Sequence, residues 1–447
     1  MNYFADGNEV FSLPSILAGQ TMKENYISDE SKSNWSKLKL IGFRFIFTYL
    51  VFYNFPEPLG SLKFLSFITK PYDEFWKVIC VWVGKVIFSQ EITYQFNGSG
   101  DTTYDYILLF CYFCLSLIIT IIWTLFERKR FNYSRLFQYL SVYVKYVVAL
   151  TMITYGSRKI IQSQFPAPWL ERLLEPYGDS SPMAILWTFM GSSYPFNVFT
   201  GMGEMIGGLL LIFKRIRVLG GLILVAVLAN IVMLNFSYDV PVKLYSTHLL
   251  LMTFFILLPD LRRLFNFFFF NKAVQPEIYQ PLFTKPKMNR WLSIFAKTFV
   301  VFFIIYSFYL SHEASKMYTT KTEFYGIWNV EEIEMNGTRQ EPLLTNGTRW
   351  RKVIFEYPDW ISVYLVNEKY VRFLLEVNRE EQTFVFTVPK EPNLKTRITY
   401  SQPNPDEMIL EGTWDEKTFK AKLKRMEKKF LLQERGFHWI NEVPYHR

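Results

Sequence analysis

The sequence predicts an α-helical membrane bundle of about seven transmembrane helices, followed by a C-terminal antiparallel β-barrel. The first observation is a series of apolar blocks between residues 39 and 311, each close to the roughly 20 residues that a helix needs to cross a bilayer. The second is a change beyond Lys321 to short segments in which apolar and polar residues alternate, as in half-buried strands. The mean hydropathy of +0.08 is therefore the average of two unlike halves.

The predicted domain boundaries follow these changes in composition. Residues 1–38 are polar and mixed in charge, without the apolar core and small-residue cleavage site of a signal peptide, so we expect a cytoplasmic segment that is not cleaved. The parts that follow are a transmembrane bundle at 39–265, a basic cytoplasmic linker at 266–290, a last transmembrane helix at 291–311 and a barrel at 322–447.

Seven apolar blocks account for the predicted spans. They cover residues 39–55, 104–126, 135–156, 196–213, 216–235, 243–259 and 291–311. Between the first two, residues 72–90 have an apolar and aromatic face interrupted by Lys77 and Lys85. This pattern predicts a helix that lies in the membrane interface instead of crossing it. If the segment did cross, the orientation of every later span would be reversed.

The Lys and Arg residues predict the orientation. They cluster at Arg128–Arg135, at Lys214–Arg217 and between Arg262 and Arg290, all on one side when seven helices are threaded. Because cytoplasmic loops carry such an excess, we expect a multi-pass inner-membrane protein with its N-terminus inside and its barrel periplasmic or extracellular. The same clusters explain the formal charge of +9 without nucleic acid as a partner. Membrane lipids and other membrane subunits are the expected partners.

Four of the polar residues within the predicted spans are candidates for a site, because a charged side chain there costs about 2.5–3.5 kcal/mol and usually has a role. The four, which we expect in one depth band, are Lys145, Glu204, Asn230 and His248. One interpretation is a polar pocket in which Lys145 pairs with Glu204 and His248 handles a proton or orients a head group. The other is interhelical polar contact without a ligand, and the sequence favours neither. Three further candidates are expected at the outer face: Lys159, Asp239 and Lys243.

Small residues and cysteines in the spans have a structural interpretation. The glycines from Gly201 to Gly208 surround Glu204, and such residues let helix backbones approach closely. Cys111 and Cys114 lie one turn apart, but an apolar span lacks the water-accessible helix N-terminus that lowers the pKa of a redox thiol. With four histidines and three cysteines the sequence offers neither a zinc motif nor a pair of haem ligands, so no metal is expected.

Residues 135–265 resemble the DoxX-like membrane proteins. The matching parts are a helix that ends in Gly156 and is followed by Lys159, a Pro-containing loop, Glu204 embedded among glycines that include the Gly207–Gly208 pair, and a basic turn. The resemblance implies a four-helix core and a membrane quinone as cofactor, with an oxidoreductase subunit as the activity if the protein is an enzyme. It assigns no catalytic residue. The membrane domain of vitamin K-dependent carboxylase is similar in architecture alone.

The polar tail predicts eight or nine short strands in sequence, which suit an up-and-down barrel. Gly326 and Trp328 give a Gly-x-Trp motif that resembles the start of lipocalin-like barrels, and the resemblance implies that Arg435 on the last strand stacks on Trp328. The inward aromatic residues either fill the barrel or leave room for an apolar ligand. They include Phe355, Tyr357, Phe373, Phe384 and Phe386. The aromatic C-terminus is expected to dock on the barrel or on the outer membrane surface.

Three functions are compatible with the sequence. The first is a quinone-associated redox or redox-support protein, in which the barrel caps the polar pocket. The second is a binding or transport protein, in which the barrel takes up a lipid or another apolar ligand. The third is an assembly protein, in which the polar residues only pack helices together. The sequence contains no nucleophile elbow, phosphate-binding glycine loop or metal motif that would indicate a common enzyme class.

Overall fold

The computed structural model describes residues 34–94, 97–275, 281–389 and 391–446, so residues 1–33 of the predicted N-terminal segment lie outside the described residues. Contacts divide the chain into two compact units. The first comprises Met1–Tyr155 and Gly203–Ile304, and the second comprises Gly156–Met202 and Ile305–Arg447. The second unit therefore contains the ends of three long helices in addition to the C-terminal domain.

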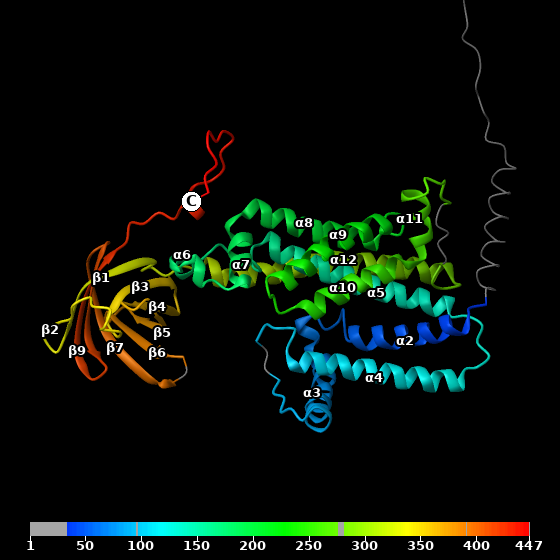
Figure 1. The fold of residues 1–447 in the computed structure, drawn as a ribbon, viewed down its shortest axis with the longest axis horizontal. Coiled ribbons are helices and arrows are strands. Elements are labelled where there is room, and N and C mark those ends of the chain that lie inside the picture. The colour runs from blue at the N-terminus through cyan, green and yellow to red at the C-terminus, as the bar shows by residue number, and fades with distance from the viewer. Residues whose placement is uncertain (1–33, 95–96, 276–280, 390, 447) are drawn as a thin grey trace, which may run out of the picture. The chain divides into compact units, whose positions relative to one another are not determined.

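Most of the helices of the first unit run side by side, whereas α3 and α11 lie across them (Figure 1). The helices are α2 (Lys37–Asn54), α3 (Ser66–Phe88), α4 (Thr103–Phe126), α5 (Ser134–Ile160), α8 (Tyr194–Ile212), α9 (Arg217–Ser237), α10 (Lys243–Leu257), α11 (Leu261–Phe268) and α12 (Pro286–Thr319), with short 3-10 turns at Lys63–Leu65 and Leu258–Asp260. Helix α5 contributes five of the buried residues in the main core, where it meets α2, α8, α9 and α10. It is the central helix of this unit.

Six of the described helices are long and apolar enough to cross a membrane, and they fit a multi-pass membrane protein. They are α4, α5, α8, α9, α10 together with α11, and α12. The predicted first span at 39–55 corresponds to α2, which is not among the six. Its 18 residues include three charged ones, Lys37, Lys39 and Arg44, so by composition alone α2 does not resemble a span.

Helix α2 nevertheless packs in the main core, where Phe43 and Leu50 are buried. Its one deeply placed charge, Arg44, is 3% exposed and is held by hydrogen bonds. The guanidinium donates to the Tyr133 hydroxyl at 2.9 Å, to the Thr124 hydroxyl at 2.8 Å and to the Glu127 carbonyl at 2.8 Å. A buried charge with several acceptors is tolerated, so Arg44 does not prevent α2 from belonging to the bundle.

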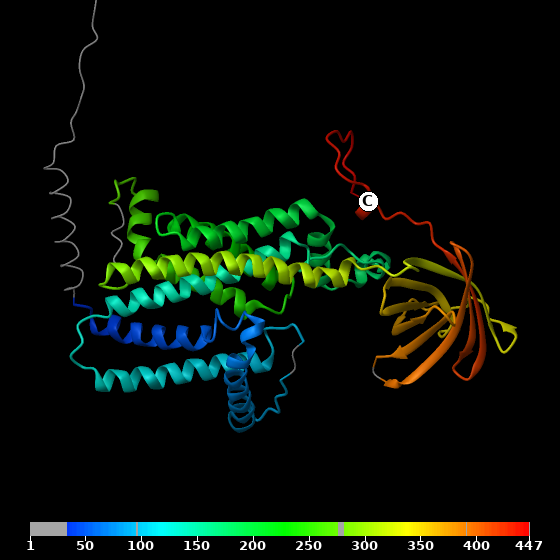
Figure 2. The ribbon, with the colours of Figure 1, turned by 180° about the vertical axis from the view of Figure 1, so that it is seen from behind.

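Helix α3 lies across the long helices (Figure 2). It contains the predicted interfacial segment at 72–90 and is not among the six candidate spans. One face is buried against α4 through Trp76, Cys80 and Val83, whereas Phe75 and Trp82 are more than half exposed. The position of this segment in the membrane interface stays a prediction.

Glycines set the spacing between α8 and its neighbours. A Cβ atom on Gly220 would lie 2.4 Å from the backbone nitrogen of Leu211, and one on Gly208 would lie 2.8 Å from the carbonyl oxygen of Ala149. Both distances are too short for a real Cβ atom, and both neighbours are backbone atoms that cannot move aside. The glycines thus permit close backbone approach, which supports the packing interpretation of the small residues.

The second unit contains the predicted antiparallel barrel. The strands are β1 (Gly326–Met335), β2 (Thr338–Arg339), β3 (Trp350–Tyr357), β4 (Trp360–Leu365), β5 (Tyr370–Asn378), β6 (Thr383–Val388), β7 (Glu391–Asn404), β8 (Glu407–Trp414) and β9 (Lys417–Arg425). From β3 onward each strand pairs with the next, and β1 pairs with both β3 and β9, which closes an eight-stranded barrel. Strand β2 pairs with β1 alone and is a short extension. The fold class predicted from the sequence is confirmed.

Large side chains fill the inside of the barrel. Trp328, Trp350, Phe355, Phe384 and Phe386 are all at most 2% exposed and pack in one core with the aliphatic residues of the other strands. Neighbouring rings lie close together, with centroids 5.6 Å apart for Phe355 and Phe384. Of the two interpretations of the inward aromatic residues, the structure favours a packed core over a container for a ligand.

The predicted stacking of Arg435 on Trp328 is wrong, because the predicted last strand around Arg435 does not form. Residue 435 follows a short helix, α13 (Leu431–Glu434), and its guanidinium lies 4.2 Å from the ring centroid of Tyr445. The cation over Trp328 is Arg425 at the end of β9, at 4.8 Å. Pairing of β9 with β1 brings Arg425 opposite Trp328, so the closing strand supplies the cation and no further strand is needed.

We expect Arg425→Ala to weaken the barrel by about 0.5–2 kcal/mol, because it removes the cation from the Trp328 ring. The measurement is hydrogen exchange of the β1 and β9 amides in the full-length protein. Arg435→Ala is the matched control and should leave this protection unchanged. Equal losses in the two variants would contradict the assignment.

Candidate functional site

The polar residues of the bundle gather around His248 on α10, which is 9% exposed. Its Nδ1 lies 2.7 Å from the carbonyl oxygen of Leu244, and its Nε2 lies 2.7 Å from the hydroxyl of Tyr49 on α2. A carbonyl oxygen only accepts, so Nδ1 carries the proton and donates, and in the neutral ring Nε2 accepts from the Tyr49 hydroxyl. The imidazole is thereby fixed in one tautomer and one orientation.

Aromatic rings and hydroxyl groups from three helices surround this imidazole. The Tyr53 ring stacks on His248 with centroids 4.1 Å apart and an interplanar angle of 14°, and Tyr49 lies beside Tyr53 at 6.2 Å. One turn before His248 on α10, the Tyr245 hydroxyl lies 3.4 Å from the hydroxyl of Thr151 on α5, and the Tyr155 ring is 6.4 Å from that of Tyr245. We call Tyr49, Tyr53, Thr151, Tyr155, Tyr245 and His248 the tyrosine–histidine cluster.

The sequence analysis identified His248 but missed the tyrosines. The chain has 28 tyrosines, so no single tyrosine stands out in the sequence as a candidate for a site. A signal was nevertheless present, because the cluster members occur in pairs three or four residues apart on α2, α5 and α10, and such pairs share one helix face. Which face meets which helix depends on how the helices rotate when they pack.

Lys145 lies at the level of this cluster. The Phe137–Phe255 ring contact at 5.4 Å and the Thr151–Tyr245 contact at 3.4 Å fix an antiparallel register between α5 and α10. This register places Lys145 within about one turn of His248 along the bundle. Lys145 is 9% exposed, and its ammonium group lies 5.0 Å from the ring centroid of Tyr146.

Glu204 lies at a different depth. Gly201 approaches Gly156 and Gly208 approaches Ala149, so α8 runs antiparallel to α5 and Glu204 is level with Ile153. Lys145 is eight residues away, or about 12 Å along the axis. The predicted ion pair between Lys145 and Glu204 would have to span this axial offset of about 12 Å. Glu204 is 1% exposed and, between the two glycines on the same face, it is turned towards α5.

Asn230 does not take part in the cluster, because its position on α9 is exposed. The buried amide on this helix is that of Asn235, five residues further on, which donates to the Ser246 hydroxyl of α10 at 3.0 Å. Lys145 and His248 share a level, and Glu204 lies about 12 Å further along the bundle, level with Thr151 and Tyr155 of the cluster. Asn230 faces outward. The common depth band of the four residues stays a prediction.

Two of the three residues predicted for the outer face, Asp239 and Lys243, pair with each other. Lys243 makes an ion pair with Asp239 at 2.9 Å and lies 3.8 Å from Asp101. Asp101 also accepts from the backbone amides of Lys243 and Leu244, so this loop carboxylate caps α10. Lys159 belongs to the second unit, is 7% exposed and lies 5.8 Å from the Phe165 ring.

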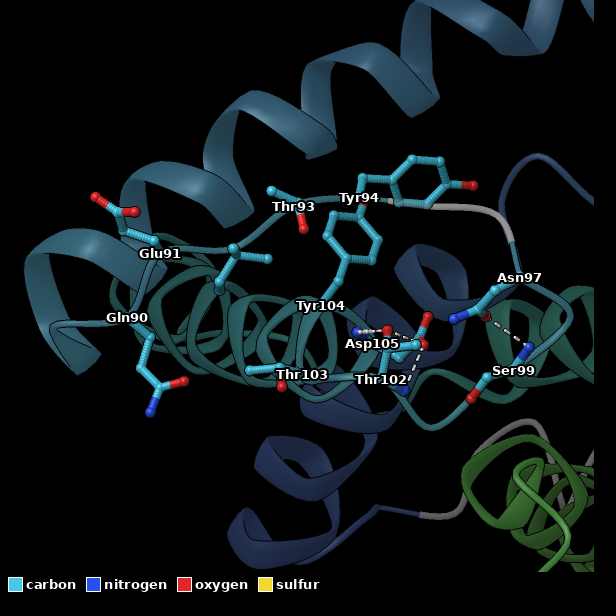
Figure 3. A pocket seen from close by; sticks show the side chains of 11 residues that line it. Gln90, Glu91, Thr93, Tyr94, Asn97, Ser99, Thr102, Thr103, Tyr104 and Asp105 are labelled. Carbon is cyan, nitrogen blue, oxygen red and sulfur yellow. Dashed lines mark hydrogen bonds between the residues drawn. The ribbon is translucent and has the colours of Figure 1, made fainter. Parts of the chain in front are cut away.

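A polar cavity of about 460 Å³ lies beside the connection from α3 to α4 (Figure 3). Its lining includes Glu91, Tyr94, Asn97, Thr102 and Asp105. Asp105 accepts from the backbone amide of Thr102 at 2.9 Å, and the Thr102 hydroxyl accepts from the amide of Asp105, which makes a capping box for α4. Glu91 points away from these groups. Thr102 and Asp105 of this cavity therefore stabilise the N-terminus of α4.

The second unit contains another polar cluster, which joins the barrel to the connection between α5 and α8. This connection includes α6 (Leu170–Leu174), a 3-10 turn (Tyr177–Asp179) and α7 (Pro182–Ser192). Both carboxylate oxygens of Glu356 on β3 accept from the backbone amide of Leu170, at 3.0 and 2.9 Å. The carboxylate of Glu171 accepts from Arg372 on β5 and from the Ser362 hydroxyl on β4.

Apolar packing supports these bonds. Leu170 is buried against Ile327 and Ile354 on the outer face of the barrel. Burial raises the pKa of Glu356 to about 7, although the hydrogen bond from the Leu170 amide favours the charged form. Glu171 raises this pKa further by repulsion, and Lys321 opposes the rise. The α6 docking site therefore contains a carboxyl group that titrates near neutral pH.

Comparison with known proteins identifies one relationship. A stretch of 123 residues is 31% identical to the uncharacterized protein YwoB of Bacillus subtilis (strain 168) and covers 27% of this chain and 77% of YwoB. The chain belongs to the YwoB family. No family model matches the chain, and no solved structure matches it. Because YwoB is itself uncharacterized, membership of this family brings no activity with it.

We expect the docking of α6 on the barrel to weaken as the pH rises. The folded-state pKa of Glu356 exceeds its ordinary value of 4.5, so this group's contribution to docking is fully present below about 4.5 and is lost as the pH rises through about 7. The measurement is the protection factor of the Leu170 amide, corrected for intrinsic exchange, between pH 5 and 8.5.

In Glu356→Gln the dependence on pH should disappear. Glu376→Gln is the matched control, since Glu376 is an exposed barrel carboxylate paired with Lys395, and this variant should keep the dependence. A flat profile in the unmodified protein would refute the role of Glu356.

Proposed function

We propose that this protein is a multi-pass inner-membrane protein that binds the head group of a quinone at the tyrosine–histidine cluster, in a redox or redox-support role. The observation that carries the proposal is the fixed imidazole of His248, which accepts from the Tyr49 hydroxyl and stacks on the Tyr53 ring inside the bundle. Buried polar groups in a membrane are costly, and they usually mark a site.

The chemistry of the cluster fits a quinone head group. Such a group has a flat ring with two carbonyl oxygens, and it is bound by aromatic faces and by hydrogen-bond donors. Tyr53 and Tyr245 would supply aromatic faces and hydroxyl donors, and the hydrogen-bonded pair of His248 and Tyr49 would accept or return a proton. The positive charge of Lys145, at the same level, would favour binding of an electron-rich quinone ring. Bound quinone would supply the capacity to carry two electrons and two protons.

The DoxX-like resemblance of residues 135–265 supports the same proposal, because four members of the cluster lie in the resembling region: Thr151, Tyr155, Tyr245 and His248. Within this proposal the DoxX-like bundle covers residues 39–265 and the lipocalin-like domain covers residues 322–447. The basic clusters at Arg128–Arg135 and Lys214–Arg217 support a cytoplasmic position for these turns, which places the barrel outside.

The barrel has a structural role in this proposal. Its packed interior argues against a carrier of lipids, and its outer face holds the connection between α5 and α8 through Glu356 and Arg372. We infer that the barrel steadies this connection, so that the ends of two bundle helices are held by a rigid domain.

The test is equilibrium binding of decyl-ubiquinone and of a naphthoquinone with an alkyl tail to the full-length protein in lipid nanodiscs. We expect saturable binding above that of empty nanodiscs. Tyr245→Phe should raise the Kd roughly two- to ten-fold, since a hydrogen bond contributes about 0.5–1.5 kcal/mol. His248→Ala should have a larger effect because it removes a ring and an acceptor.

Tyr106→Phe is the matched control, because Tyr106 on α4 is 51% exposed and lies outside the cluster. It should bind both quinones as the unmodified protein does. Two results would contradict the proposal. One is quinone uptake equal to that of empty nanodiscs, and the other is a Tyr245→Phe variant that binds quinone no more weakly than Tyr106→Phe.

A further inference from the structure

The C-terminal segment after the barrel carries an unusual set of exposed apolar residues. Residues 436–446, which we call the aromatic tail, follow α13 (Figure 1). Within the tail Phe437 is 76% exposed, Trp439 91%, Ile440 79% and Val443 69%. A soluble surface rarely presents so many large apolar side chains over so few residues, and such a patch marks a site of interaction.

Polar contacts within the segment keep the aromatic tail folded back on itself. The Arg435 guanidinium donates to the Asn441 side chain at 2.7 Å and stacks on the Tyr445 ring at 4.2 Å. The Asn441 amide in turn donates to the carbonyl oxygen of His438 at 3.1 Å. The polar groups of the tail thus bind one another, and its apolar side chains face outward.

The residues just before the aromatic tail are held against the connection between α5 and α8. Phe430 packs in the cluster of Leu170 and Ile354, and the Gln433 side chain donates to the carbonyl oxygen of Pro168 at 2.8 Å. Pro168 lies in the connection that follows α5 by eight residues and leads to α8, and both helices are candidate spans. The Ser157–Ser311 contact at 3.1 Å places the end of a third span, α12, in the same unit.

We propose that the aromatic tail inserts into the membrane interface on the barrel side and anchors the barrel to the lipid surface. Helix ends leave the bilayer where the connection begins, so a segment attached to that connection is within reach of the head groups. Trp, Tyr and Phe beside cations are the residues that favour this interface, and here Arg435 and His438 accompany them. The proposal stands on the second unit and is independent of quinone binding.

The experiment places an environment-sensitive NBD label at residue 440. Full-length protein in which the three native cysteines are replaced by serine carries Ile440→Cys and is reconstituted in phosphatidylcholine vesicles, with and without lipids that bear a nitroxide near the head group. Retention of the fold is checked on the unlabelled protein by the protection of the β1 and β9 amides. We expect a blue-shifted emission and loss of most of it to the nitroxide lipids.

The matched control is Glu416→Cys in the turn between β8 and β9, which should keep the emission of a label in water. Trp439→Asp combined with Phe437→Asp, in the presence of the label at 440, should abolish the quenching. Unquenched emission at 440, equal to that at 416, would overturn the proposal. Emission that is insensitive to nitroxide lipids but changes with the density of protein in the vesicle would also overturn it, in favour of a second copy as the occupant.

Discussion

Close approach of helix backbones is the constraint on which the bundle depends. Helices in lipid gain little from hydrophobic burial against each other, because lipid chains are as apolar as leucine, so van der Waals contact between backbones carries more of the stability. At Gly208 on α8 and Gly220 on α9 no other residue fits, since the facing atoms belong to the backbones of α5 and α8, respectively. These contacts fix the register of α8, and the central position of α5 follows from contacts of this kind on several sides.

A fixed register also decides which polar groups can act together. Packing of α2, α5 and α10 brings four tyrosines and His248 together, and Glu204, held between glycines, is level with Ile153 on α5, about 12 Å along the helix axis from Lys145. The sequence analysis treated charge inside a span as the main signal. In the structure the richer site is built from hydroxyl groups and one imidazole, which cost less to bury than a carboxylate or an ammonium group.

The barrel and the bundle are stabilised by different interactions. The barrel closes by strand pairing between β1 and β9 and is filled by aromatic rings, so it needs neither a disulfide nor a ligand to have a core. The connection between α5 and α8 is bound to it by ionic and apolar contacts at α6. Contacts therefore assign this connection to the same unit as the barrel, although it separates two membrane helices in the sequence.

The sequence by itself determined the types of element and their order. Six apolar runs and eight of the predicted strands appear where the patterns placed them, because hydrophobic length and period are local properties of the chain. Tertiary structure decided the partners: Arg425 instead of Arg435 on Trp328, Asn235 instead of Asn230 at α10, and Glu356 under α6. These choices depend on register and rotation between segments far apart in the chain. A one-residue change in strand pairing, or a third of a turn in a helix, would replace each partner with another.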